Sequence, residues 1–324
     1  MERTKILNFG SVGTSSIMRV MQEAIRLTDG TVSKLLYSRS AERGRDFAQS
    51  EGIPESCDSY DAMLARNDLD VIYIASPNRF HTDQALKALN AGKHVIVEKP
   101  TAVTAEEVRA LYEAANANHV FFFEAITTLF MPNFLACKQL LSQLGPLHSA
   151  RLAYGQYSSK YDAYLRGENP NVFNPDMQGG VLNDMGIYCV HAAVNLLGEP
   201  ESVRYKAECG PNGVDLSGTL TLKYPALTCE ITMAKDRSLE SGCRFEGEHG
   251  YFEERGPLND FVRCSAALNG MVQEINVQSD GNRMLYELAR FRDAILEGDA
   301  DFFSAMAKQS ILAASVLEQA HRCI

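Results

Sequence analysis

Long apolar runs are missing from this chain of 324 residues, and a membrane-spanning helix would need one of about 18 residues. The first ten residues, MERTKILNFG, are typical of the beginning of a strand rather than of a charged segment followed by a long hydrophobic one. We therefore expect a cytoplasmic protein without a membrane partner.

Basic charge is also scarce. Lys and Arg number 31 against 41 Asp and Glu, so the formal net charge is -10. A protein that binds the phosphate backbone of nucleic acid presents a surplus of cationic side chains, and this chain has no such surplus. We expect no nucleic-acid partner, and a small molecule as the ligand.

Paired cysteines and clusters of metal ligands are absent from the sequence as well. The eight cysteines are scattered singly, with no CxxC pair and no histidine group at metal-ligand spacing. We expect reduced structural thiols and no metal site, with a redox role as the less favoured alternative.

What the sequence does contain is an alternation of short apolar strands and amphipathic helices over roughly its first 120 residues. Strands are predicted over 5–9, 32–37, 71–75, 94–97 and 119–123, with helices from residue 17 and over 41–51, 82–90 and 104–115. This alternation predicts parallel strands joined by right-handed crossovers. We therefore expect a three-layer α/β domain that binds a dinucleotide over residues 1–122.

The pattern changes beyond Glu124. A long helix is predicted over 181–197, and period-two alternation follows in segments such as 219–224 and 227–232. Turn signals at 211–213 and 249–250 predict hairpins, and two amphipathic helices are expected towards the end of the chain, one ending at Gly298 and one over 302–322. We expect a second, α+β domain over 123–324 that is built on a mainly antiparallel sheet.

The turn after the first strand is rich in glycine and serine, and it is the first candidate for a cofactor contact. A backbone that approaches a pyrophosphate tolerates no side chain, and the helix N-terminus that follows stabilises negative charge. Compared with the pattern GxGxx(G/A), Ser15 replaces the second glycine and Met18 a small residue, so a tight turn without a ligand is an equal alternative. The candidate contacts are Gly13, Thr14, Ser15, Ser16 and Ile17.

The end of the second strand bears on the choice of dinucleotide. An acidic residue there binds the ribose hydroxyl of NAD, whereas an arginine beside small hydroxyl residues suits the 2'-phosphate of NADP. This chain has Tyr37, Ser38, Arg39 and Ser40, with no carboxylate. We favour NADP over NAD, with Ser38 and Arg39 as contacts. The alternative is that the arginine is a solvated residue at the start of a helix.

Two further predicted strands end in polar residues. The carboxyl ends of neighbouring strands form the crevice in which a dinucleotide lies, so Ser76, Pro77 and Asn78 are expected at the same site as Glu98 and Lys99. A lysine at a buried strand end loses hydration and can exchange protons near neutral pH, and Pro100 restricts its backbone. The alternative is a lysine whose ammonium extends to solvent beside Glu98.

The helix predicted over 181–197 carries polar residues on one face. Asp184, Tyr188 and His191 are spaced at i, i+4 and i+7. An acid and a phenol on an otherwise apolar helix line a cleft or find hydrogen-bond partners in the core. Hydrogen bonding within the core would be the commoner outcome if the helix stood alone.

Four segments of the chain are informative when taken together: SPNRFH at 76–81, AGKHVIVEKP at 91–100, EAITTLFMP at 124–132 and GGVLNDMGIY at 179–188. They resemble the glucose-fructose oxidoreductase, inositol dehydrogenase and rhizopine-catabolism family, called Gfo/Idh/MocA. The resemblance covers nearly the whole chain, and the element at 91–100 is highly specific. The chain departs from the family at two places. Ser15 replaces the second glycine, and Thr128-Leu129 stands where many relatives carry an arginine.

The resemblance implies an N-terminal Rossmann domain and a C-terminal domain whose large open sheet forms a homodimer or homotetramer. It also implies an NAD(P)-dependent dehydrogenase that transfers a hydride between the cofactor and the CH-OH group of a sugar, polyol or related small alcohol. Lys99 matches the family lysine, Asp184 the helix aspartate and Tyr188 the proton-handling residue, in its tyrosine version. Asn78 and His81 match residues near the cofactor, and Glu98 precedes the lysine as expected.

Lys99 and Tyr188 are accordingly expected to approach one nicotinamide ring from separate halves of the chain, with Asp184 orienting the substrate or the lysine. One alternative from another class is a non-catalytic regulator that binds NADP without turnover. Another is an enzyme that never releases its cofactor between turnovers.

Overall fold

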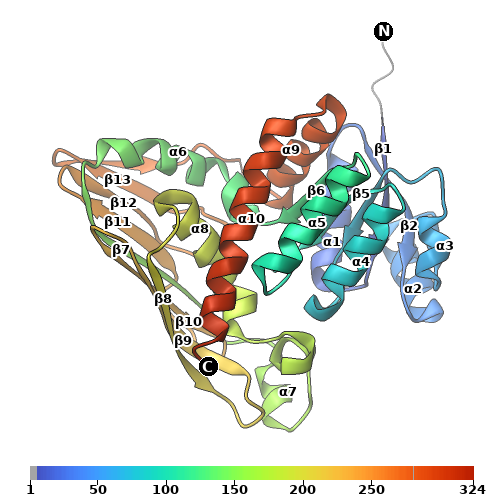
Figure 1. Ribbon diagram of the computed structural model, residues 1–324, viewed down its shortest axis with the longest axis horizontal. Helices are drawn as coiled ribbons and strands as arrows, with labels where there is room; N and C mark the ends of the chain where they lie inside the picture. The colour runs from blue at the N-terminus through green and yellow to red at the C-terminus, as the bar shows by residue number, and fades with distance from the viewer. Residues whose placement is uncertain (1–5, 280) are drawn as a thin grey trace. The chain divides into compact units, whose positions relative to one another are not determined.

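Two compact units make up the residues that the computed structural model describes, 6–279 and 281–324 (Figure 1). The first unit contains residues 6–102, 106–125 and 282–308, and the second contains 103–105, 126–279, 281 and 309–324. Residues 282–308, which the predicted boundary places in the second domain, thus cluster with the first unit. The apolar face of this segment needs a partner, and Phe291 stacks on Phe123 with 4.6 Å between ring centroids.

The first unit is built on a six-stranded sheet in the order β3-β2-β1-β4-β5-β6, in which every pair is parallel. The strands are β1 Leu7–Val12, β2 Thr31–Tyr37, β3 Glu55–Cys57, β4 Val71–Ile74, β5 His94–Glu98 and β6 Phe122–Ala125. The order reverses between β1 and β4, and such a reversal is where a doubly wound sheet binds its ligand.

Helices cover this sheet, and their sequences explain where they begin and end. They are α1 Ser16–Leu27, α2 Ala41–Glu51, α3 Tyr60–Leu64, η1 Asn78–Phe80, α4 His81–Asn90, α5 Ala105–Ala117, α9 Met284–Glu297 and the first part of α10 Ala300–His321. Ser40 caps α2 by accepting a hydrogen bond from the Arg43 amide, and Gly52 ends it in the left-handed region.

The prediction of a parallel α/β sheet is confirmed, with small shifts in its bounds. The first strand extends to Val12, and Lys5 of the predicted strand lies outside the described residues. β3 was not predicted, because three residues are too short for an alternation signal.

The second unit is built on an eight-stranded sheet in the order β14-β13-β12-β11-β7-β10-β9-β8. Among the described strands only the β7–β10 pair is parallel, so the sheet is mainly antiparallel as predicted. The strands are β7 Leu147–Gly155, β8 Ser202–Cys209, β9 Asp215–Lys223, β10 Thr228–Ala234, β11 Gly242–Gly247, β12 Gly250–Glu254, β13 Cys264–Leu268 and β14 Met271–Ile275. Hairpins connect β8 to β9 and β11 to β12 at the two predicted turns.

One face of this sheet is covered by helices. Figure 1 shows α6 Pro132–Leu140 and α8 Ile187–Leu197 on the same side of the strands. Along β10, Cys229, Ile231 and Met233 are fully buried, whereas Thr228 and Glu230 on the other face are exposed. The shorter elements are η2 Thr127–Phe130, η3 Leu141–Gln143, α7 Tyr161–Leu165, η4 Asn171–Phe173, η5 Pro175–Met177 and the π-turn η6 Leu182–Gly186.

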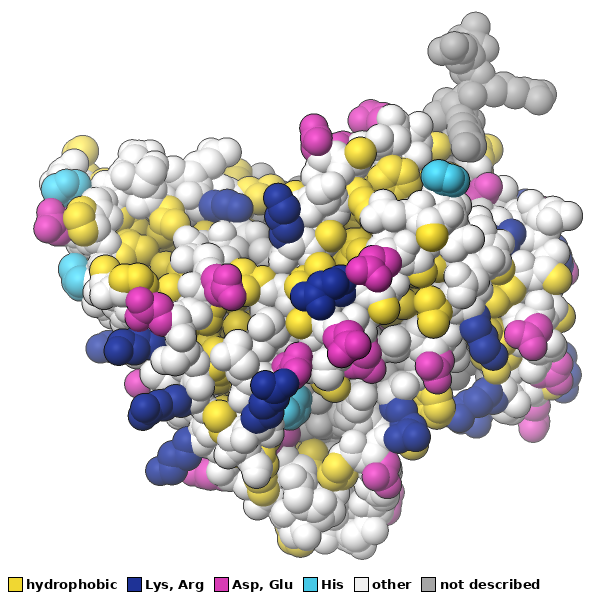
Figure 2. Space-filling model, viewed as in Figure 1, with side chains coloured by type: hydrophobic (Ala, Val, Ile, Leu, Met, Phe, Trp, Pro, Cys, Tyr) yellow, Lys and Arg dark blue, Asp and Glu magenta, His cyan; other side chains and the backbone are white. Residues whose placement is uncertain are grey.

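The charge distribution on the surface and the character of the helices can be compared with the expectation of no nucleic-acid and no membrane partner. Figure 2 shows Lys and Arg side chains interspersed with Asp and Glu over the face in view. Within the described residues, no helix combines the length and the apolar character that crossing a bilayer requires.

Candidate active site

The turn after β1 brings the backbone against the neighbouring strand end. Gly13 has φ 107°, and a Cβ there would lie 2.7 Å from the carbonyl oxygen of Ala75. A side chain at this position would therefore meet both a forbidden backbone conformation and a backbone clash. Glycine thus lets the turn pack directly on the backbone that follows β4.

The N-terminus of α1 follows this turn directly. Ser15 is the N-cap residue, but its side chain accepts no capping hydrogen bond, and its hydroxyl instead reaches the carbonyl oxygen of Ala75 at 3.5 Å. The first turn, which contains Ser16 and Ile17, has no acidic residue. Its N–H groups and the helix dipole therefore suit an anion, so the chain fits a dinucleotide even with serine in place of the second glycine.

The end of β2 presents hydroxyl groups and one cation. Ser38 is buried, and its hydroxyl accepts a hydrogen bond from the Ser40 amide at 3.3 Å. Arg39 is exposed, and its guanidinium lies 5.2 Å from the ring centre of Phe80. The aromatic ring supports the planar cation while leaving its donors able to bind a phosphate.

The segment after β4 is tied to the end of β5 through His81. One ring nitrogen of His81 lies 2.9 Å from the carbonyl oxygen of Pro100 and the other 2.8 Å from that of Ser76. Two carbonyl partners would suit an imidazolium, but burial lowers the pKa of His81 and the Lys99 ammonium lowers it further. Burial is the larger effect, so the pKa of His81 lies below its ordinary value although the two carbonyl partners act in the opposite direction. The ring thus joins two strand ends, and its direct contact with a cofactor stays a prediction.

Carboxyl groups lie beneath the strand ends of β5 and β6. Glu98 is buried, and its Oε1 accepts a hydrogen bond from the Tyr73 hydroxyl at 2.5 Å. Burial raises the pKa of Glu98, although this hydrogen bond and the neighbouring Lys99 act in the opposite direction. Glu124 accepts a hydrogen bond from the Thr101 amide at 2.9 Å. These contacts hold the segment on both sides of Lys99, which follows β5 and is half-buried.

In the second unit, the predicted long helix begins with a π-turn rather than an α-helical one. Asp184 lies in this turn, and its Oδ2 forms an ion pair with the Lys235 Nζ at 2.6 Å. The Asp184 side chain is 38% exposed, whereas that of Lys235 is only 2% exposed. The lysine is therefore a buried cation whose charge partner reaches the surface.

Tyr188 and His191 follow on α8. Tyr188 is buried, with its ring centre 5.8 Å from that of Tyr154. His191 is fully buried, and Gln309 donates to its carbonyl oxygen at 3.1 Å. His191 therefore belongs to the core, as the structural alternative predicted for this polar stripe. Asp184 differs because its carboxylate stays accessible.

Two family models match the chain, one after the other. Residues 7–125 match the model described as oxidoreductase family, NAD-binding Rossmann fold, and residues 134–253 match the GFO/IDH/MocA C-terminal domain. The chain belongs to the GFO/IDH/MocA family of oxidoreductases. The resemblance found in the sequence motifs is thereby confirmed.

Named relatives of this GFO/IDH/MocA protein are similar over most of their length. It is 32% identical to scyllo-inositol 2-dehydrogenase (NADP(+)) IolU of Bacillus subtilis, over 98% of this chain and 97% of that one. It is 29% identical to trans-1,2-dihydrobenzene-1,2-diol dehydrogenase of Xenopus tropicalis, over 88% and 87% of the two chains.

Solved structures share the fold of this family member. The 3-ketoreductase KijD10 of Actinomadura kijaniata, in complex with NADP and TDP-benzene, superposes with a TM-score of 0.87 at 21% identity, covering 98% of each chain. Levoglucosan dehydrogenase, in complex with NADH and levoglucosan, gives a TM-score of 0.83 at 20% identity over 99% of this chain and 98% of that one. The predicted fold class, the prediction of an oxidoreductase and the prediction of NAD(P) as cofactor are confirmed. The comparisons give no support to a non-catalytic regulator.

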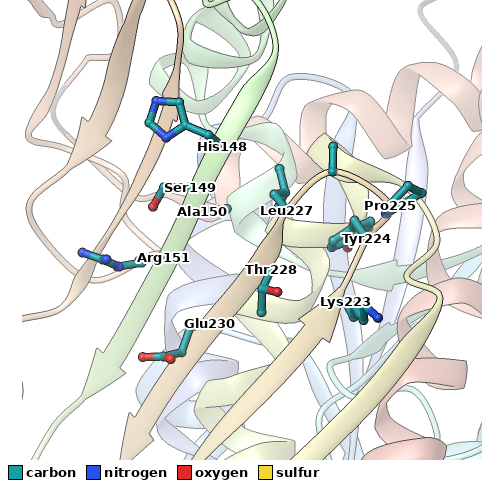
Figure 3. Close-up of a pocket in the computed structure, with 11 residues that line it drawn as sticks. His148, Ser149, Ala150, Arg151, Lys223, Tyr224, Pro225, Leu227, Thr228 and Glu230 are labelled. Atoms are coloured by element: carbon teal, nitrogen blue, oxygen red, sulfur yellow. The ribbon is translucent and has the colours of Figure 1, made fainter.

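An open pocket of about 550 Å³ lies elsewhere in the second unit of this GFO/IDH/MocA chain. Figure 3 shows His148 and Arg151 of β7, Thr228 and Glu230 of β10, and Lys223 at the end of β9 around it. Its lining contains none of the three predicted catalytic residues. We therefore assign it to the polar face of the sheet rather than to the reaction.

Sequence reasoning missed Lys235. Its signal was present, because the alternation along β10 places residue 235 on the same face as the buried Cys229, Ile231 and Met233. A lysine that points inward directly after a central strand needs a charged partner. That requirement points to an acid on the helical layer that covers this face, which is where Asp184 lies.

Proposed function

We propose that this protein transfers a hydride between NADP and the hydroxyl-bearing carbon of a sugar, a polyol or a related small alcohol. The observation that carries the proposal is the nearly full-length match at 32% identity to an NADP-dependent scyllo-inositol dehydrogenase. It is supported by the glycine turn and the uncapped start of α1 in the first unit.

The cofactor and the predicted catalytic residues would have separate roles in the reaction. Bound dinucleotide would supply the hydride acceptor for alcohol oxidation. Tyr188 or Lys99 would take the proton that leaves the substrate hydroxyl, and Asp184 would orient the substrate by accepting a hydrogen bond from a hydroxyl group. The first unit would bind the cofactor and the second the substrate.

Within the first unit we propose the predicted cofactor contacts as a group. They are Gly13, Thr14, Ser15, Ser16, Ile17, Ser38, Arg39, Ser76, Pro77, Asn78, His81, Glu98 and Lys99. NADP is favoured over NAD because the end of β2 carries Arg39 and two serines and no carboxylate between residues 37 and 40.

We also propose a homodimer or homotetramer that forms through the second sheet. Support comes from its edge strand β14, where Met271 is 75% and Val272 65% exposed, a degree of exposure that suits an interface. A cytoplasmic location is supported by the eight cysteines, which are all free thiols.

Hydride transfer is tested with the purified full chain. We would scan a panel of inositols, other polyols and sugars with NADP+ and with NAD+, and follow the absorbance of the reduced nicotinamide. Turnover of at least one polyol or sugar is expected, with the higher kcat/KM for NADP+. Tight NADP binding without turnover, including with paired oxidisable and reducible substrates, would contradict the proposal.

The cofactor preference is tested separately at Arg39. Losing its charge-assisted contact to a 2'-phosphate would cost about 1.5–3 kcal/mol, so Arg39→Ala should weaken NADP binding roughly 10- to 100-fold. NAD binding should change little. Arg45, an exposed residue farther along α2, provides the control Arg45→Ala. Equal losses for both cofactors would show that Arg39 does not read the 2'-phosphate.

A further inference from the structure

Lys235 lies directly after β10, a central strand of the second sheet, and its backbone is tied on both sides. Its N–H donates to the carbonyl oxygen of Leu216 at 2.8 Å, and its carbonyl oxygen accepts from the Ser158 amide at 2.9 Å. The backbone position of this residue is therefore set by the sheet.

The ammonium group of Lys235 has partners from two other segments. It donates to the Asp184 Oδ2 at 2.6 Å and to the carbonyl oxygen of Val172 at 3.3 Å, and it lies 4.9 Å from the ring centre of Phe173. A short charge-assisted hydrogen bond, a carbonyl and an aromatic face together compensate a cation that is almost fully buried. The direction of the ammonium is thus determined by its surroundings.

Asp184 is held at one side and accessible at the other. Its Oδ2 is anchored to a buried cation, yet more than a third of the side chain is exposed. It also lies in a π-turn, η6, and single π-turns are frequent at functional sites. A carboxylate held in one orientation by a rigid partner is suited to accept a hydrogen bond from a hydroxyl group.

We propose that Lys235 is a positioning residue for hydride transfer, which holds the Asp184 carboxylate in the orientation that accepts a hydrogen bond from a substrate hydroxyl. This inference rests on the proposed function, because it concerns how the second unit binds the substrate. Lys235 itself acts through Asp184 and does not take part in proton transfer.

The two partners of the ion pair are not equivalent, and this guides the choice of variants. Removing the lysine leaves a carboxylate that water can solvate, whereas removing the carboxylate leaves a buried ammonium without its charged partner. Lys235→Met should therefore fold more readily than Asp184→Asn. The double variant replaces both charges and should recover thermal stability that Asp184→Asn loses. Lys223→Met, at the exposed end of β9, is the matched control.

The experiment is a double-mutant cycle in kcat/KM, with the best polyol or sugar from the panel and NADP+. We expect Lys235→Met to lower kcat/KM about 10- to 100-fold, the scale of a misplaced binding group. The KM for the polyol or sugar should rise while the KM for NADP+ stays within about twofold of wild type. In the Asp184→Asn background, Lys235→Met should add less than a twofold further loss.

Four results would overturn the inference. Wild-type kcat/KM in Lys235→Met would show that the lysine does not matter for turnover. Equal losses in both backgrounds, or a parallel rise in the KM for NADP+, would show a general structural role. If the wild-type protein turns over no member of the panel, the proposed function fails and this inference fails with it. If the wild type is active and the Lys235→Met variant is equally active, only the inference is refuted.

Discussion

The strand ends of the first sheet and the π-turn of the second unit hold their polar groups in different ways. In the first unit the buried Glu98 and Glu124 accept hydrogen bonds from neutral donors, the Tyr73 hydroxyl and the Thr101 amide. In the second unit the Asp184–Lys235 pair joins residues 51 positions apart. The comparison teaches that these carboxyl groups of the first unit are held by neutral hydrogen-bond donors, whereas Asp184 of the second unit is held by a buried cation.

Lys99→Met should have the largest effect on turnover and would test the first half of the comparison. The loss of a group that exchanges protons at the substrate should lower kcat by about 10²-fold or more. NADP should still bind, because the substitution removes one of the proposed contacts and leaves the glycine turn and α1 unchanged. Lys87→Met on the exposed side of α4 is the control, and stopped-flow hydride transfer is the measurement. Turnover at the wild-type rate would show that Lys99 is wrongly assigned.

Tyr188→Phe tests whether the phenol of Tyr188, in the second unit, takes the substrate proton. It keeps the buried ring against Tyr154 and removes only the hydroxyl, so thermal stability should change little. If the phenol carries the proton, kcat should fall by about 10²-fold, with the affinity for NADP preserved. A loss in Lys99→Met without one in Tyr188→Phe would assign the proton to the lysine alone.

Gly13→Ala should mainly affect cofactor affinity. Gly13 has φ 107°, which alanine rarely adopts, and the new Cβ would clash with the Ala75 carbonyl oxygen. The turn must therefore shift, at a cost of about 1–3 kcal/mol. Gly52→Ala is a matched control, since Gly52 also has a positive φ, of 69°, but nothing within 4 Å of its Cβ position. We expect NADP affinity to fall about tenfold or more for Gly13→Ala only. Equal affinities of the two variants in a fluorescence titration would show that the turn does not contact the cofactor.

The pH dependence of stability should show the smallest effect. Burial lowers the pKa of His81 from 6.5, so below that pH the unfolded chain binds a proton that the folded chain does not. Stability should therefore fall as the pH is lowered through this region, with a contribution of at most about 1.4 kcal/mol per pH unit. His81→Gln should flatten this slope in urea unfolding measured between about pH 5 and 8. An unchanged slope would mean that the ring is protonated in the folded state.

Most of the first unit could be predicted because its signals are local. The strand over Val71–Ile74, the polar residues after it and the helix that begins at His81 follow one another within a dozen residues. The placement of 282–308 could not be predicted, since the contact of Phe291 with Phe123 joins segments far apart in the chain. The π-turn at Leu182–Gly186 was also missed, because its residues are spaced like those of an ordinary helix.

The sequence by itself determined the parallel and antiparallel sheets, the glycine turn at Gly13 and the lysine that follows β5, because periodicity and turn chemistry act over a few residues. Only the tertiary structure decided that His191 belongs to the core and that Asp184 is paired with Lys235. Burying a lysine is costly without a nearby opposite charge, and which carboxylate supplies that charge depends on how strands and helices pack.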